Sequence, residues 1–369
     1  MGRHLPLLFI LVFCSELVFP QVSISGKVLN DANGSPLEGA SVYINNSTLG
    51  STTNADGSYR LSGVMPGTYD IIVSFVSFEP IVHRVSIENK DLKFTFRMNE
   101  KATQMRDILV MSDELRKKRL KTLRDLFLGV TLAGERSRIL NEDDIFFEGG
   151  NKKGEIIAFS EQPLIVINKE LGYKIYFELK KFYLDEVQGR SYFFGFTRYE
   201  DLEKGNRKKW EKRRLQYYQG STMHFYHCLS DGNTKENDFR IFRIREVDGA
   251  EIRTISEVAG DSIVKQDSVR QMKYIDVDGS ILVKYLNDPY YKSHLKTKVM
   301  LSNGAARGIQ STLTILEYPC YLDRSGLLEN PLSVQYSGFW SYEKLANMLP
   351  VDYNPPNRKP EFNPLRTKP

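Results

Sequence analysis

The 369-residue sequence predicts a mostly β protein, in which an N-terminal β-sandwich precedes an α+β, β-rich domain. Three observations carry this prediction. Apolar and polar residues alternate along several short runs, as they do in strands that bury one face. Asn-Gly and Asp-Gly pairs separate these runs, and such pairs tolerate the positive φ of tight turns. The chain also holds 20 Tyr and 21 Phe, aromatic residues that favour strands over helices.

The first residues indicate export. Arg3 and His4 precede an apolar run, Leu5–Phe13, which is too short to span a bilayer. We interpret residues 1–21 as a signal peptide. Two alternatives stay open, namely lipidation at Cys14 and retention of the segment as a signal anchor. No later stretch is long and apolar enough for a transmembrane helix, so we expect a periplasmic, outer-membrane-associated or extracellular protein.

Residues 22–99 hold the clearest alternation in the chain. In the last run of this segment, Leu92 and Phe94 alternate with Lys93 and Thr95. About seven such short strands follow one another at hairpin spacing, which is typical of a β-sandwich.

Two turn signals lie between the middle strands of this domain. Asp56-Gly57 is suited to a tight turn, and Pro66-Gly67 suits the two central positions of a type II turn. Residues 52–75 are therefore expected to form strand, tight turn, strand, Pro-Gly turn and strand.

The same segment carries recognisable motifs. They are Gly26-Lys27-Val28, Pro36–Val42, Gly50, Thr53, Asp56–Tyr59 and Pro66–Tyr69. With these motifs, residues 22–99 resemble the carboxypeptidase-like regulatory domain, a transthyretin-like (prealbumin-like) sandwich common in exported proteins of Bacteroidetes-type bacteria. Ser77-Phe78 departs from the Gly-Tyr that this family usually has, and we expect the departure to change only a strand end.

The resemblance brings no peptidase activity with it. In metallo-carboxypeptidases this module accompanies a separate zinc-binding domain, which needs a His-x-x-Glu pair and a distant His. No His in this chain has Glu three residues later, and His-Glu-x-x-His does not occur. Nucleophile elbows, phosphate-binding loops and dinucleotide fingerprints do not occur either. We therefore expect neither catalytic residues nor a cofactor, while scattered catalytic groups stay open as an alternative.

Residues 100–130 are expected to form a linker and a basic helix. Leu115, Leu120, Leu123 and Phe127 give this helix a rough apolar stripe. Its basic face is expected to be solvated.

Residues 131–349 return to strand-like runs and form the predicted α+β domain. Two adjacent hairpins are expected around the alternating run that begins at Tyr173. A helical pattern over residues 206–229 is interrupted at Gly220-Ser221. The Pro-rich tail 350–369 is expected to be extended or disordered. Further expected elements are strands at 239–246, 271–276, 280–286, 309–316 and 332–339, and a short helix over Ser341–Met348.

The stretches PLIVINKELGYKIYFELKKF and YYQGSTMHFYHCL are similar to a block found behind the same regulatory module in Bacteroidetes envelope proteins. The resemblance spans residues 110–345 and implies a shared architecture. No activity is attached to that block, so the resemblance assigns no functional residue.

Three residues are candidate metal ligands. His224 and Cys228 are one helical turn apart, and His227 lies beside them. The sequence supplies no convincing third and fourth ligand, and a helix that faces the core explains the spacing more simply. We therefore predict no metal site. Whether Cys228 pairs with Cys320 or both are buried small residues stays open.

Residues 276–280 resemble the start of a calcium loop. The twelfth position of such a loop is occupied here by Asn287 instead of Glu. A hairpin turn at Asp278-Gly279 is the simpler interpretation.

A basic stretch is the candidate binding surface. An anionic glycan, a lipid headgroup or an acidic protein would suit it, and a solvated helix face is the alternative. The formal charge of +5 is too small to indicate nucleic acid. The members of this stretch are Arg207, Lys208, Lys209, Trp210, Arg213 and Arg214.

These observations predict an exported, envelope-associated protein without catalysis. Its sandwich would be a stability or docking module, and its α+β domain would bind or scaffold a protein or glycan partner. The alternative is a hydrolase with catalytic groups dispersed over residues 150–345. A deep polar pocket with converging Asp, Glu or His would favour the enzyme, whereas a flat exposed aromatic or basic surface would favour binding.

Overall fold

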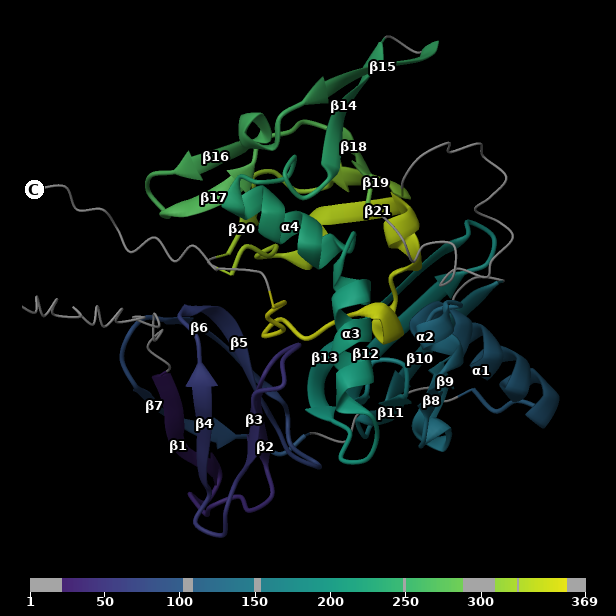
Figure 1. The fold of residues 1–369 in the computed structure, drawn as a ribbon. Helices are drawn as coiled ribbons and strands as arrows, with labels where there is room; N and C mark the ends of the chain where they lie inside the picture. Colours follow the sequence, from purple (N-terminus) through teal and green to yellow (C-terminus); the bar gives the residue numbers. More distant parts are fainter. Residues whose placement is uncertain are drawn as a thin grey trace, which may run out of the picture.

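The computed structural model describes residues 22–101, 109–148, 154–247, 250–287, 309–323 and 325–356. The predicted signal peptide, with Cys14, lies outside the described residues, as does the end of the predicted tail. Three bodies of β structure follow one another along the chain (Figure 1). Among the described residues, every helix is too short or too polar to cross a membrane.

The first body is a two-sheet β-sandwich. Its strands are β1 (Val22–Asn30), β2 (Ser41–Ile44), β3 (Gly50–Thr52), β4 (Ser58–Val64), β5 (Gly67–Ser74), β6 (Ile81–Ile87) and β7 (Leu92–Met98). One sheet has the order β4-β1-β7, with β1 parallel to β7, and the other has the order β3-β2-β5-β6. Val28, Val42 and Ile71 are fully buried between the sheets. The predicted N-terminal sandwich is therefore confirmed.

The turn residues of this body connect the two sheets instead of neighbouring strands of one sheet. Gly57 makes the turn before β4 with φ +75°, as predicted. Gly67 opens β5 outside the left-handed region, so the predicted type II turn at Pro66-Gly67 is wrong. The chain changes sheet at both points because each strand must keep its apolar face toward the shared core.

The second body is built on one long strand. Its strands are β8 (Ser137–Ile139), β9 (Ile145–Glu148), β10 (Glu155–Ser160), β11 (Leu164–Asn168), β12 (Tyr173–Asp185) and β13 (Arg190–Asp201), with a 3₁₀ turn, η1 (Glu142–Asp144), before β9. β13 pairs along one edge of β12, while β11 and then β10 pair along the other edge. The two adjacent hairpins predicted here are β11–β12 and β12–β13.

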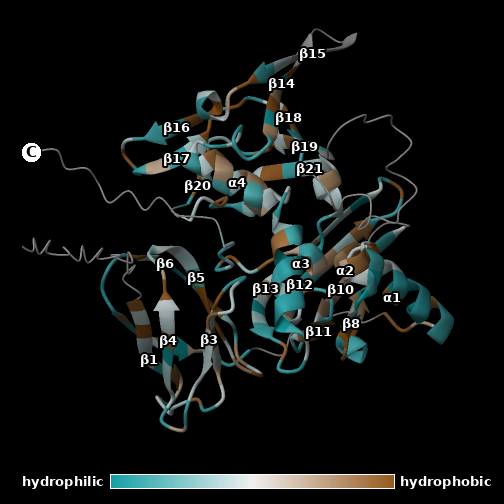
Figure 2. Ribbon diagram, viewed as in Figure 1, coloured by the Kyte–Doolittle hydropathy of each residue, from teal (hydrophilic) through white to brown (hydrophobic). Residues whose placement is uncertain are grey.

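Helices α1 (Asp113–Phe127) and α2 (Leu132–Glu135) pack on one face of this sheet. The Ser112 side chain accepts the Leu115 N–H at the start of α1, which is an N-cap. Phe127, the last residue of α1, lies 4.9 Å from both Phe177 and Phe193, measured between ring centroids. The outer side of α1 is mainly hydrophilic (Figure 2). The predicted amphipathic helix is therefore confirmed, but Leu115 of its predicted apolar stripe is 40% exposed.

The third body has a five-stranded sheet, β15-β14-β18-β19-β21, and a three-stranded sheet, β16-β17-β20. Helices α3 (Arg207–Tyr218) and α4 (Thr222–Asp231) precede it in the chain. The remaining elements are β14 (Phe239–Val247), β15 (Ala250–Val258), η2 (Gly260–Ile263), β16 (Val264–Asp267), β17 (Met272–Ile275), β18 (Ser280–Tyr285), β19 (Ile309–Ile315), β20 (Cys320–Leu322), η4 (Pro331–Ser333), β21 (Val334–Gly338), η5 (Phe339–Tyr342) and η6 (Leu345–Asn347).

Helices α3 and α4 pack into different hydrophobic cores, and the chain passes from one core to the other at the break between them. Gly220 has φ +80°, and a Cβ atom there would lie 2.6 Å from the Tyr285 ring. Ser221 then caps α4 by accepting the His224 N–H. Tyr218 packs into the core of the second body, and Phe225 packs into the core of the third. The interruption predicted at Gly220-Ser221 is therefore confirmed.

Two local predictions in the third body are wrong. β17 pairs with β16 and β20, whereas β18 pairs with β14 and β19, so the turn at Asp278-Gly279 connects two sheets and is no hairpin. Gly279 does have the expected positive φ, +88°. The predicted helix over Ser341–Met348 is replaced by the short 3₁₀ turns η5 and η6.

The sandwich contacts the second body through β2 and the loop that follows it. The Asn46 N–H donates to the Thr197 carbonyl of β13 at 2.7 Å. The Tyr43 hydroxyl donates to Glu178 Oε1 of β12 at 2.8 Å, in a buried position. These contacts extend the second sheet toward the sandwich and place the two bodies side by side (Figure 1).

The first residues of the predicted disordered tail are ordered in this contact. The Val351 N–H donates to the Asn46 carbonyl at 2.7 Å, and Asp352 Oδ1 accepts the Thr48 N–H at 2.9 Å. Tyr353 packs against the core of the second body. The prediction of disorder is therefore wrong for residues 350–356, because their backbone groups and one aromatic ring find partners on both bodies.

Candidate binding surface

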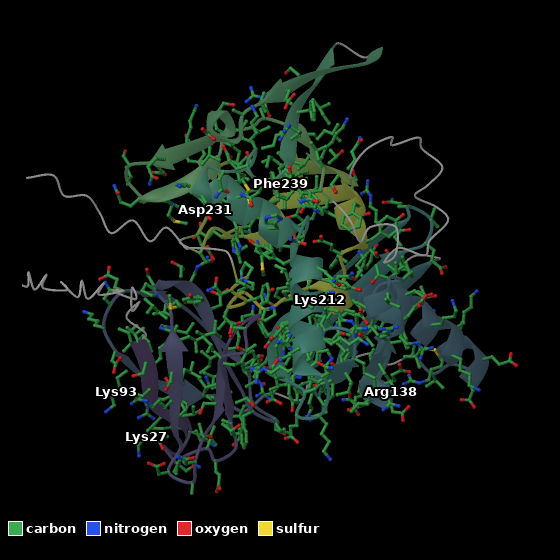
Figure 3. The ribbon with its side chains drawn as sticks, viewed as in Figure 1. Lys27, Lys93, Arg138, Lys212, Asp231 and Phe239 are labelled. Carbon is green, nitrogen blue, oxygen red and sulfur yellow. The ribbon has the colours of Figure 1, made fainter. Side chains whose placement is uncertain are left out.

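The predicted basic stretch lies on α3. This helix begins after Asn206, whose side chain accepts the Lys209 N–H at 3.0 Å. Arg207, Lys208 and Lys209 are exposed on its first turn, and Lys212 follows on the next turn (Figure 3). Most of the Arg207 side chain, 76%, is open to solvent.

Two members of the stretch belong to the protein interior. Trp210 covers Gly172 so closely that a Cβ atom there would lie 2.1 Å from the indole. The Arg214 guanidinium lies 3.7 Å from the centre of the Tyr173 ring and donates to Asp201 Oδ1 at 2.6 Å. Both side chains are more than nine-tenths buried, so they anchor α3 and offer no surface to a ligand.

Arg213 is also engaged inside the protein. Its Nε atom lies 3.1 Å from Glu170 Oε1, and Arg136 contacts the other carboxylate oxygen at 2.6 Å. Glu170 is almost fully buried, and a buried carboxylate is stabilised by two such partners. The basic surface that remains on α3 is therefore smaller than the sequence suggested.

The candidate metal ligands are part of the core around α4. His224 Nδ1 accepts the Gly220 N–H at 3.1 Å, and its ring lies 5.0 Å from the Phe239 ring. His227 Nδ1 lies 3.0 Å from the Tyr218 hydroxyl. Both imidazoles therefore have structural roles at the junction of α3 and α4.

Cys228 and Cys320 are both buried thiols in the core of the third body. Burial raises the pKa of the Cys320 thiol to about 12, which keeps it protonated near neutral pH. Within the described ranges, no three His, Cys, Asp or Glu side chains gather closely enough to hold a metal ion.

The outer face of the β12–β13 hairpin carries a different surface. Tyr192 and Phe194 of β13 are 50% and 49% exposed, although large apolar rings are usually covered. Their neighbours on β12 point the same way because the strands pair in antiparallel register. We call this surface the aromatic platform, and its residues are Lys180, Lys181, Tyr183, Tyr192, Phe194 and Phe196.

A β-bulge explains why two consecutive lysines reach the platform. The register between β12 and β13 shifts between Leu179 and Lys181, so one extra residue stands on β12. Lys181 Nζ lies 5.8 Å from the centre of the Tyr192 ring, and Lys180 Nζ lies 5.7 Å from the centre of the Phe196 ring. The bulge therefore brings two ammonium groups to the same aromatic face.

The rings of the platform are held in place by their neighbours. Tyr183 and Tyr192 stack with centroids 5.2 Å apart and an angle of 25° between planes. Phe194 and Phe196 meet edge to face at 5.9 Å. The Tyr183 hydroxyl donates to Glu155 Oε1 at 3.0 Å, and this bond raises the pKa of Tyr183. The platform is thus largely formed without a ligand.

A concave space of about 420 Å³ lies elsewhere, beside β14 and β15. Its charged side chains include Arg240 and Glu257, whose Nε and Oε1 atoms are 3.6 Å apart. These charges partner each other, and no His or Cys is among the residues that line the space. The platform is the stronger candidate for a functional surface.

The platform could not be predicted from the sequence because its strand is aromatic on both faces. In the run SYFFGFTRY, Phe193 packs inward while Tyr192 and Phe194 face outward. Hydrophobic alternation cannot distinguish two such faces. The available sequence signal for an outward face was on the preceding strand, where lysines alternate with apolar residues.

Comparison with protein families identifies the first body. Residues 24–110 match the family model of the CarboxypepD_reg-like domain, so the chain carries this module, as the sequence motifs indicated. A search of curated proteins found no match.

Solved structures with similar folds include proteins of several kinds. The chain is similar to a type II cohesin–X-dockerin complex from Acetivibrio cellulolyticus (20% identity, 21% of this chain, 56% of that chain, TM-score 0.19). It is also similar to the pilus 2b backbone protein of group B streptococcus (17% identity, 22% of this chain, 42% of that chain, TM-score 0.20). A third similar structure is a putative carbohydrate binding protein from Bacteroides uniformis (13% identity, 42% of this chain, 57% of that chain, TM-score 0.20). The chain spans less than two thirds of each of these structures.

Proposed function

We propose that this protein is an exported, envelope-associated binding protein that holds a glycan on the aromatic platform without transforming it. The observation that carries the proposal is the exposure of Tyr192 and Phe194 on a preformed sheet face. Tyrosine and phenylalanine rings offer rigid apolar faces, and tyrosine adds a polar edge. The C–H faces and hydroxyl edges of sugar rings complement such a surface.

The sandwich has a supporting role in this proposal. The loop after β2 is bonded to β13, and Tyr43 of β2 is bonded to Glu178 of β12, so both strands that carry the platform are contacted. The module therefore holds the hairpin from one side and leaves the outer rings open. A rigid supporting element lowers the entropic cost of binding.

The geometry supports binding more than the hydrolase alternative. Tyr192 and Phe194 are exposed on a sheet face, and in the 420 Å³ space Glu257 is paired with Arg240. A hydrolase needs an acid and a base that converge on one substrate bond.

Glycan binding by the full chain tests the proposal. We expect Tyr192→Ala to weaken binding to a panel of envelope and plant-type polysaccharides by about tenfold, since losing an aromatic anchor costs about 1–2 kcal/mol. The control is Tyr318→Ala, because Tyr318 is 58% exposed on the third body. Equal loss in both variants, or release of reducing ends from any polysaccharide, would contradict the proposal.

A further inference from the structure

The charges of the platform define its ligand more closely. Lys181 Nζ lies 5.8 Å and 5.9 Å from the centres of the Tyr192 and Tyr183 rings. Within the described part of the chain, its ammonium forms no ion pair with a carboxylate at 4.0 Å or less. A ring face attracts an ammonium but leaves N–H donors available, since Lys carries three.

Three carboxylates near the platform have partners within the protein. Glu178 accepts the Tyr43 hydroxyl and lies 3.1 Å from Lys180 Nζ. Glu155 accepts the Tyr183 hydroxyl, and Asp185 accepts the N–H groups of the turn after β12. These acceptors are bonded within the protein, whereas Lys181 keeps an exposed charge beside the rings.

The geometry points to an acidic polysaccharide as the ligand, with sugar rings on Tyr192 and Phe194 and a carboxylate or sulfate group against Lys181. This inference rests on the proposed function and adds the charge of the ligand to it. An ammonium that already lies over the rings can reach an acidic group on a sugar stacked there. Charge-assisted bonds of this kind are about twice as strong as neutral ones.

Pairs of polymers with similar backbones and different charge show whether binding depends on the charge of the ligand or on its shape. The full chain is titrated with polygalacturonate and with its methyl ester, and then with carboxymethylcellulose and methylcellulose. We expect the acidic member of at least one pair to bind about tenfold more tightly, and higher salt to reduce that advantage. Vesicles with anionic lipid headgroups serve as a third kind of anionic probe.

The variant Lys181→Gln is expected to lose most of the advantage of the acidic polymer while it keeps binding to the neutral one. Lys93→Gln is the control, because Lys93 is an exposed lysine on the sandwich (Figure 3). Lys181→Arg should restore the preference, since Arg retains the charge.

Each other outcome overturns the inference. Equal binding of acidic and neutral polymers would leave the platform as a glycan site and remove the charge requirement. Binding to anionic vesicles alone would replace the polysaccharide by a lipid surface. Binding to no polymer of either pair and to no member of the wider panel would overturn the proposed function as well.

Discussion

Glu343 shows how burial alters the pKa of a single side chain. Its carboxylate lies at the start of α4, where Thr222 donates its N–H at 3.2 Å and its hydroxyl at 2.9 Å. Burial raises the pKa of Glu343 to about 7, against the opposing effect of these two hydrogen bonds. The desolvation of the carboxylate is therefore the stronger influence.

The raised pKa of Glu343 predicts that the free energy of unfolding falls as pH rises. Because its pKa is raised on folding, the native protein binds more protons than the unfolded chain between its usual value of 4.5 and about 7. From about pH 5 to about pH 8, wild type should lose about 1–3 kcal/mol of unfolding free energy relative to Glu343→Gln. Denaturant unfolding at several pH values measures this difference.

Glu203→Gln is the control for Glu343, because Glu203 is exposed. A constant difference between wild type and Glu343→Gln across the pH range would show that the carboxylate keeps an ordinary pKa in the folded protein.

At the scale of elements, α3 is held against the second sheet by the close packing of Trp210 as well as by ion pairs. Trp210 lies directly over the turn between β11 and β12, where only a glycine leaves room for the indole. Gly172 in this turn also has φ +73°, a conformation that glycine adopts at low cost.

Two glycine variants separate these two requirements. Gly172→Ala should lower the unfolding free energy by about 3–4 kcal/mol, from the backbone strain and the clash with Trp210 together. Gly189→Ala should cost only about 1–2 kcal/mol, because Gly189 has φ +62° and open space around its Cα. Equal losses in chemical denaturation would mean that Trp210 yields to the new methyl group.

Much of the element order could be predicted from local signals. Alternation located the sandwich strands, and the Gly220-Ser221 pair located the break between α3 and α4. Turn chemistry predicted the positive φ of Gly279 but not which strands would pair around it. Pairing depends on contacts between residues far apart in the sequence, which no local pattern contains.

The candidate surface was predicted less well than the fold. The α3 stretch has a high density of positive charge, but charge density does not reveal that Arg214 stacks on Tyr173. The platform depends on a bulge and on the side of the sheet that helices leave uncovered. Both features follow from tertiary packing and not from spacing along the chain.

At the scale of the whole molecule, polar contacts connect the sandwich to the rest. Tyr43 bonds to the buried carboxylate of Glu178, and Asp352 bonds to the N–H of Thr48. Several hydrogen bonds to charged groups, each worth about 1.5–3 kcal/mol, can couple the unfolding of neighbouring bodies.

The double variant Tyr43→Phe/Asp352→Ala should uncouple the sandwich. We expect one calorimetric transition for wild type and two for the variant, because each body has its own hydrophobic core. Tyr59→Phe is the control, since the Tyr59 hydroxyl donates to Phe94 within the sandwich. Two transitions already in wild type would argue against this coupling.

The location of the bound sugar tests the central claim most directly. A crystal structure of the full chain with an acidic oligosaccharide should show sugar rings stacked on Tyr192 and Phe194, with an acidic group beside Lys181. Sugar bound along the basic edge of α3, or in the space beside β14, would contradict the account.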